Sequence, residues 1–85
     1  MPANVEITQH SAACWELKVN LIPRHNDPRK HEFEAFLAHN NLRVNKDYGW
    51  SARGYQILTI LVESHSQAEE AKKLIEEWGE ENLPK

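Results

Sequence analysis

The chain has 85 residues and a net charge of −3, with 40% hydrophobic and 27% charged residues. This composition is typical of an ordinary globular domain and excludes a disordered chain. The length fits one domain with a modest core. The apolar runs are too short to cross a bilayer, and the N-terminal residues lack the basic and apolar regions of a signal peptide. The single cysteine, Cys14, cannot form an internal disulfide, so we expect a reducing compartment, most simply the cytoplasm.

Charge is distributed unevenly along the chain. Residues 24–53 carry a net charge of +2, whereas residues 63–85 carry a net charge of −4. The middle of the chain could therefore present a modest basic patch, although the chain as a whole is not a typical polyanion binder.

The first half of the chain predicts one clear strand and one helix. Residues 1–11 form either a short edge strand or a frayed terminus. In Cys14–Ile22, apolar residues alternate with polar ones, which predicts a strand with one buried face, ended by Pro23. A helix should then start at Asp27, a good N-cap, with Pro28 in its first position. Its apolar stripe comprises Phe33, Phe36 and Leu37, and Asn40-Asn41 should end it, since Asn tolerates the left-handed conformation.

Two hairpin arrangements fit the next segment. A turn at Ser51–Gly54 makes Leu42–Trp50 a complete strand, which suits the strand lengths. A turn at Asn45–Gly49 suits the turn-forming residues instead and extends the following strand back to Trp50.

The run Gly54–Glu63 is apolar on both of its alternating faces. Its β-branched residues and its length favour a strand. A nearly continuous apolar strand lies inside a sheet, so we predict that this strand is central, with neighbours on both edges and helices on one face.

A second helix is predicted over Ser66–Trp78. Ser66 and Glu69 have the spacing of a capping box. Ala68, Ala71, Ile75 and Trp78 repeat at helical spacing and should face the core. Gly79 should end this helix, leaving residues 80–85 as a mobile tail.

The predicted order is therefore β-α-β-β-α, with a possible extra strand at the N-terminus. It predicts an α+β fold, with a small antiparallel sheet and two helices on one face. In topology it resembles the ferredoxin-like plait without its last strand, a fold that hosts many functions. The missing strand leaves the edge of Cys14–Ile22 open unless residues 4–9 or a second copy cover it, so we expect self-association through strand edges.

Neither metal nor cofactor chemistry is predicted. The five histidines (His10, His25, His31, His39 and His65) and Cys14 lack the short fixed spacings of zinc sites. No local feature activates Cys14 as a nucleophile. There is no phosphate loop, and the carboxylates are too scattered to suggest an acid–base pair. We therefore expect a protein that is not an enzyme and binds no cofactor.

The segment Arg43–Tyr55 is the candidate binding site. It interleaves bases and aromatic residues: Arg43, Lys46, Tyr48, Trp50, Arg53 and Tyr55. Trp, Tyr and Arg dominate protein–protein hot spots. We predict a small regulator or inhibitor that binds a protein partner here and does not bind membranes. The alternatives are RNA or single-stranded DNA binding, through stacking and phosphate contacts, or burial of Trp50 and Tyr55 in the core.

Overall fold

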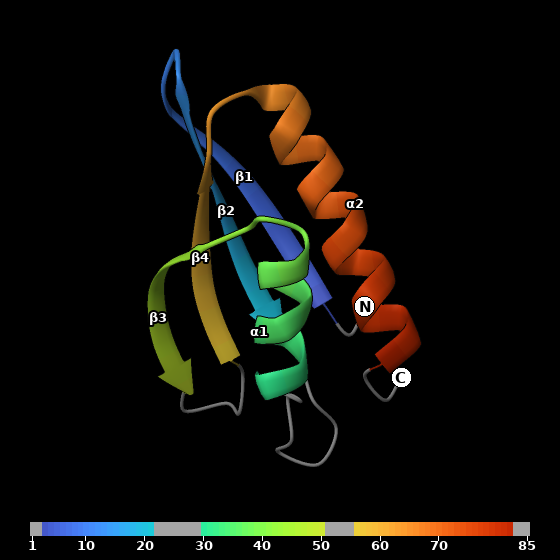
Figure 1. The fold of residues 1–85 in the computed structure, drawn as a ribbon. Helices are drawn as coiled ribbons and strands as arrows, with labels where there is room; N and C mark the ends of the chain where they lie inside the picture. Colours follow the sequence, from blue (N-terminus) through green and yellow to red (C-terminus); the bar gives the residue numbers. More distant parts are fainter. Residues whose placement is uncertain (1–2, 22–29, 51–55, 83–85) are drawn as a thin grey trace.

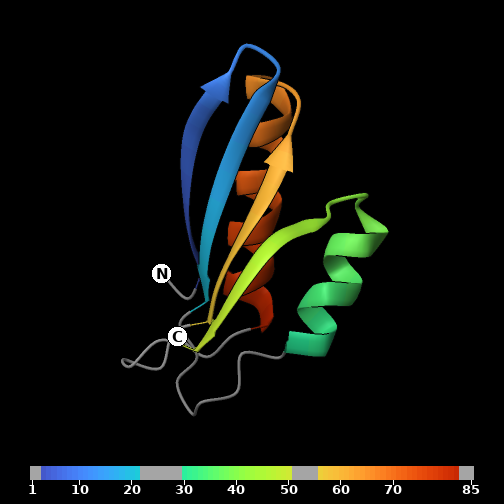
Figure 2. The same cartoon turned by 90° about the vertical axis from the view of Figure 1, so that its left-hand side faces the viewer.

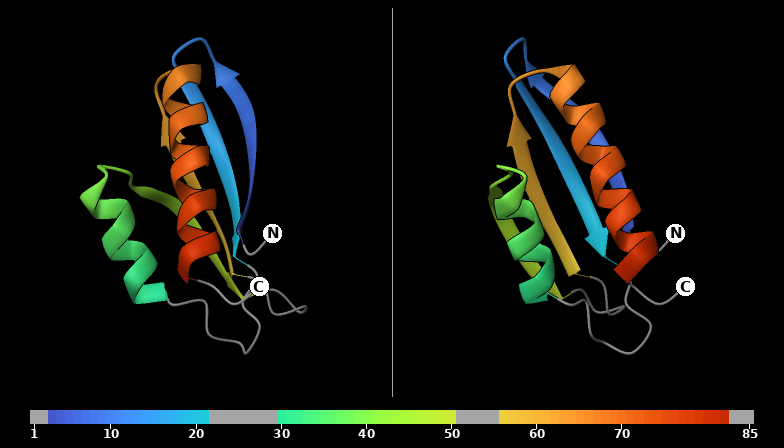
Figure 3. Two further views of the ribbon diagram at one scale, coloured as in Figure 1. Left: turned by 90° about the vertical axis from the view of Figure 1, so that its right-hand side faces the viewer. Right: turned by 45° about the vertical axis from the view of Figure 1, so that its right-hand side comes forward.

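The structure is a computed structural model that describes residues 3–21, 30–50 and 56–82. Its elements are β1 (Ala3–Ser11), β2 (Cys14–Leu21), α1 (Lys30–His39), β3 (Val44–Trp50), β4 (Gln56–Val62) and α2 (His65–Asn82). The four strands form an antiparallel sheet in the order β1-β2-β4-β3. Both helices lie on one side of it (Figures 1 and 3), so the predicted α+β class is confirmed.

The N-terminal residues form an edge strand. β1 pairs with β2 from Ala3, opposite Leu21, to Ser11, opposite Cys14. Ala3 and Val5 are buried, which gives this strand an anchored inner face. Because β1 occupies the edge of β2, the open edge on which the expected self-association depended does not exist.

Strands β2 and β4 form the centre of the sheet. Leu17, Val19 and Leu21 of β2 have no solvent exposure, which confirms the predicted alternation. β4 lies between β2 and β3, and its Leu58 and Ile60 are buried. Ile22 and Pro23 lie outside the described residues.

Strands β3 and β4 pair in an antiparallel manner up to Trp50 and Gln56, and residues 51–55 between them lie outside the described residues. Trp50 pairs with Gln56, so the alternative turn at Asn45–Gly49 is wrong. The turn-forming residues of that stretch instead form two bulges within β3, where the register shifts. At the second bulge Gly49 has a φ of 71°, and its N–H donates to Asp47 Oδ1 at 2.8 Å.

Helix α1 ends as predicted, at a left-handed asparagine. Asn41 has a φ of 60°. Its N–H donates to the Ala38 carbonyl at 3.1 Å, and the N–H of Leu42 donates to the Leu37 carbonyl at 2.8 Å. These two bonds form a Schellman motif that satisfies the last carbonyls of the helix. The predicted start at Asp27 and Pro28 lies outside the described residues.

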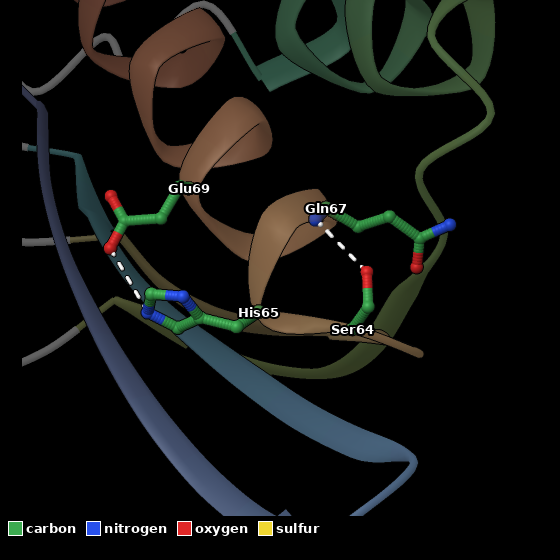
Figure 4. A network of polar contacts seen from close by, with 4 residues as sticks. All are labelled: Ser64, His65, Gln67 and Glu69. Atoms are coloured by element: carbon green, nitrogen blue, oxygen red, sulfur yellow. Dashed lines mark hydrogen bonds and ion pairs between the residues drawn. The ribbon is translucent and has the colours of Figure 1, made fainter.

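Helix α2 begins earlier than predicted, and a different serine caps it. Ser64 Oγ accepts a hydrogen bond from the Gln67 N–H at 3.2 Å (Figure 4). The side chain of Gln67 reaches back and accepts from the Glu63 N–H at 2.9 Å. The predicted capping box at Ser66 and Glu69 is therefore wrong, because both residues already lie inside the helix. Glu69 contacts the ring of His65 instead, with 3.2 Å between Nε2 and Oε1.

Helix α2 also ends later than predicted, since it continues through Gly79 to Asn82. Gly79 is not a stop signal but a point of close contact. A Cβ atom at this position would lie 2.6 Å from Ala3 Cβ, which is too close for two carbon atoms. Residues 80–82 therefore belong to the helix and not to a tail, while residues 83–85 lie outside the described residues.

The core lies between the sheet and the helices. Helix α2 covers it with the four residues predicted to face inward: Ala68, Ala71, Ile75 and Trp78. Helix α1 stands apart from the strands in Figure 2 and contributes buried Phe33 and Leu37. The ring of Phe33 lies 4.9 Å from that of Trp78, and Phe36 lies 5.9 Å from Trp78. This aromatic cluster joins the two helices.

Candidate functional site

The predicted aromatic-basic segment is described only in part. Arg43 precedes β3, and Lys46 and Tyr48 lie on it, all three exposed to solvent. The backbone of Trp50 pairs with Gln56, but its side chain lies outside the described part of the structure, as do Arg53 and Tyr55.

Lys46 and Tyr48 are brought together on the edge strand. Lys46 Nζ lies 5.0 Å from the centroid of the Tyr48 ring, within the range of a cation–π contact. Tyr48 is 55% exposed, the largest fraction among the exposed large hydrophobic residues in the described ranges. The bulges and the lysine also protect this free edge against pairing with other strands.

A second region of exposed apolar side chains surrounds Leu42. A cleft of about 410 Å³ lies between the end of α1, the end of β4 and the outer side of α2. A neighbouring hollow of about 530 Å³ lies between α1 and the start of β3. Both are lined by Asn41 and Leu42, so they adjoin at the C-terminal turn of α1.

The residues around Leu42 form an apolar patch with a charged rim. Leu61 and Leu74 line the cleft and Val44 lines the hollow, with exposed fractions of 42%, 38% and 37%. We call these three residues with Leu42 the Leu42 surface. Its charged rim consists of Glu34, Arg43, Glu63 and Glu70.

The Leu42 surface is open because β4 continues past the first residue of β3. Val44, the first residue of β3, pairs with Ile60, so Leu61 and Val62 of β4 extend beyond the end of β3. The Schellman turn then places Leu42 beside this uncovered end. Sequence reasoning assigned Leu42 and Leu61 to strands and could not have found this surface, since it depends on strand register.

The other face of the sheet carries no helix in the described structure. Register places Lys18, Thr59 and Lys46 side by side across β2, β4 and β3, and Glu6 of β1 is opposite Lys18. Thr59 is only 3% exposed, and its Oγ1 has no hydrogen-bond partner among the described residues. Of these residues, sequence reasoning had singled out only Lys46 for binding.

The described histidines and the cysteine do not converge. His10 contacts Glu16 at 3.4 Å, and the ring of His65 lies 4.8 Å from that of Trp15. Cys14 is half-buried at the start of β2. Within residues 3–21, 30–50 and 56–82, no three His, Cys, Asp or Glu side chains gather closely enough to hold a metal ion.

Helix α2 presents a mostly acidic outer side. Its exposed or half-buried carboxylates are Glu69, Glu70, Glu76, Glu77, Glu80 and Glu81, against two lysines, Lys72 and Lys73. None of the described helices has both the length and the apolar character needed to cross a membrane.

Comparison with known proteins yields no relative. No protein-family model, curated protein or solved structure matches this chain.

Proposed function

We propose that this protein is a small non-enzymatic binding module that regulates or inhibits a protein partner. The observation that carries this proposal is the Leu42 surface. Three of the four exposed large hydrophobic residues of the described chain line its two adjoining hollows. Exposed apolar patches rimmed by polar residues are typical of interaction sites.

The partner should insert apolar side chains between α1 and α2 beside the end of β4. Burial of the exposed leucines would then supply most of the binding free energy, as expected for a contact with an apolar centre. Arg43, Glu63 and Glu70 at the rim would fix the orientation of the partner. Tyr48 and Lys46, from the segment that sequence reasoning favoured, lie on β3 and offer a second contact to test.

The test is capture of a partner from the native host by the wild-type protein and by matched variants. We expect the double variant Leu61→Gln, Leu74→Gln to lose the partner, because both side chains are exposed and contribute little to the core. Tyr48→Gln is the comparison variant, because it changes a third exposed position and tests the β3 segment. Circular dichroism should show that each variant is folded.

Two further outcomes decide the proposal. Capture should survive nuclease treatment and weaken little between about 50 and 200 mM salt, whereas a nucleic-acid complex would weaken steeply. If Tyr48→Gln abolishes capture and the leucine double variant does not, the β3 segment is the site and the Leu42 surface is not.

The topology supports a further interpretation of the fold. From β2 onward the elements follow the order of a ferredoxin-like plait, and β1 lies beside β2, where such a plait has its closing strand. We propose that the chain is a plait whose closing strand comes from the N-terminal end.

A further inference from the structure

We propose that Lys18, Thr59 and Lys46 form a binding site for a phosphate group on the helix-free face of the sheet. This phosphate site is separate from the Leu42 surface, and the inference does not depend on the proposed protein partner. It rests on a buried hydroxyl that has no hydrogen-bond partner among the described residues and on two lysines that flank it.

The hydroxyl of Thr59 is the first observation. The residue is 3% exposed, and Oγ1 has no hydrogen-bond partner within the described structure. Buried polar groups are nearly always hydrogen-bonded, and each exception requires an explanation. Valine would fill the same volume without the desolvation cost. A ligand oxygen could accept a hydrogen bond from this hydroxyl. The buried hydroxyl would then be satisfied, which explains why the position holds threonine and not valine.

The two lysines are the second observation. Lys18 of β2 is directly opposite Thr59 on one side, and Lys46 of β3 is directly opposite it on the other. Paired residues point to the same face of a sheet, and strands two positions apart are separated by roughly 10 Å. Both lysines are exposed. Their long side chains can therefore converge above Thr59 on one anion.

The row of paired residues that contains Thr59 holds two lysines and one glutamate. Glu6 of β1 is opposite Lys18, on the side away from Thr59. Glu16 lies two residues before Lys18 on β2, and its carboxylate contacts His10 at 3.4 Å. Lys46 lies on the edge strand beside the Tyr48 ring. Glu6 is thus the main competitor of a bound anion for Lys18.

Phosphate matches these groups better than a single-charge anion does. Two ammonium groups balance its double charge, and lysine binds phosphate as a point charge without needing a fixed geometry. The double charge could belong to a free phosphate ion or small monoester, or to two successive phosphodiester groups of a single-stranded nucleic acid, which carry one charge each.

The experiment is a titration with inorganic phosphate, followed by amide chemical shifts at constant ionic strength with chloride as the reference anion. We expect saturable amide shifts at Thr59 and at the two lysines opposite it, Lys18 and Lys46. Lys18→Gln and Lys46→Gln should each weaken binding about tenfold or more, as expected for loss of a charge-assisted hydrogen bond. Glu6→Gln should tighten binding. Lys73→Gln, the same change on the exposed side of α2, is the control and should have no effect.

Thr59→Val separates a ligand contact from a structural role. We expect several-fold weaker phosphate binding, with a thermal midpoint equal to or above that of the wild type, because the variant removes an unpaired buried hydroxyl. The phosphate site does not exist if Thr59→Val, Lys18→Gln and Lys46→Gln have the same affinity for phosphate as the control Lys73→Gln. The absence of any saturable shift would contradict it as well.

A second titration, with an oligothymidylate at equal phosphate concentration, identifies the source. Binding at least tenfold tighter than inorganic phosphate, with the same dependence on Thr59 and Lys18, assigns the site to a nucleic-acid backbone. Equal affinity per phosphate assigns it to free phosphate or a small ester. Oligonucleotide binding that ignores these substitutions contradicts the site. Retention of the protein partner by Thr59→Val would confirm that the two proposals are independent.

Discussion

At Gly79, helix α2 crosses the first strand so closely that no side chain fits between them. The position is buried, and an added Cβ would lie 2.6 Å from the Ala3 side chain and 3.1 Å from the Ala3 backbone nitrogen. Glycine in the interior of a helix costs about 1 kcal/mol relative to alanine. Here the missing side chain lets the helix approach β1 closely, and Ala3 and Val5 are buried.

We therefore expect Gly79→Ala to destabilise the protein although alanine is the better helix former. Overpacking costs about 1–3 kcal/mol, and β1 cannot move away easily because its backbone is paired with β2. Because alanine recovers about 1 kcal/mol of helix propensity, urea unfolding should show a net loss of up to about 2 kcal/mol in the free energy of unfolding.

The matched control is the double variant Ala3→Gly, Gly79→Ala. Removing the Ala3 methyl group relieves the closest contact, so the two substitutions should be non-additive by at least about 0.5 kcal/mol. A stabilising Gly79→Ala would show that the helix does not approach the strand this closely.

The start of helix α2 depends on one side chain among several that could cap it. Ser64 and Ser66 are both serines near the helix start, and each has a Gln or Glu three residues later. Strand β4 ends at Val62, and Ser64 follows after one residue, so the strand position selects the first serine. Its carbonyl then accepts from the Ala68 N–H at 3.0 Å, the first bond of the helix.

Substitution of the two serines should distinguish the caps. Ser64→Ala should lower the free energy of unfolding by about 1 kcal/mol, because the Gln67 N–H loses its acceptor. Ser66→Ala, inside the helix and exposed, should be neutral or slightly stabilising. Thermal unfolding of both variants measures the difference, and a larger loss from Ser66→Ala would contradict the observed start.

The molecule as a whole is organised around β4. This strand pairs with β2 on one side and with β3 on the other, and its inner face is buried. Helix α1 depends on the aromatic cluster for its attachment, whereas α2 packs directly on β1, β2 and β4. Local opening should therefore cost least at β3 and α1 and most at the centre of the sheet.

Amide hydrogen exchange should follow this order. We expect the slowest exchange in Ile57–Val62. Exchange should be faster in β3, whose outer edge pairs with no strand in the described structure and whose ladder is interrupted by two bulges. Residue-resolved exchange measured by NMR tests the prediction. Rapid exchange in Ile57–Val62 would contradict the central position of β4.

Local signals in the amino-acid sequence were enough to predict several elements of the fold. Alternation identified the inner face of β2, the spacing of apolar residues identified the buried faces of both helices, and Asn41 marked the end of α1. These signals suffice because period and backbone preference act over a few residues.

Features that depend on neighbours distant in the chain became visible only in the folded protein. Pairing with β2 made residues 3–11 a strand, and register with β4 turned Asn45–Gly49 into bulges instead of a hairpin turn. Close contact with Ala3 leaves no room for a side chain at position 79, so the glycine lies within the helix and does not mark its end. The Leu42 surface and the row of Lys18, Thr59 and Lys46 have the same origin. Each joins residues from separate elements, and their proximity follows from strand register, which no local pattern encodes.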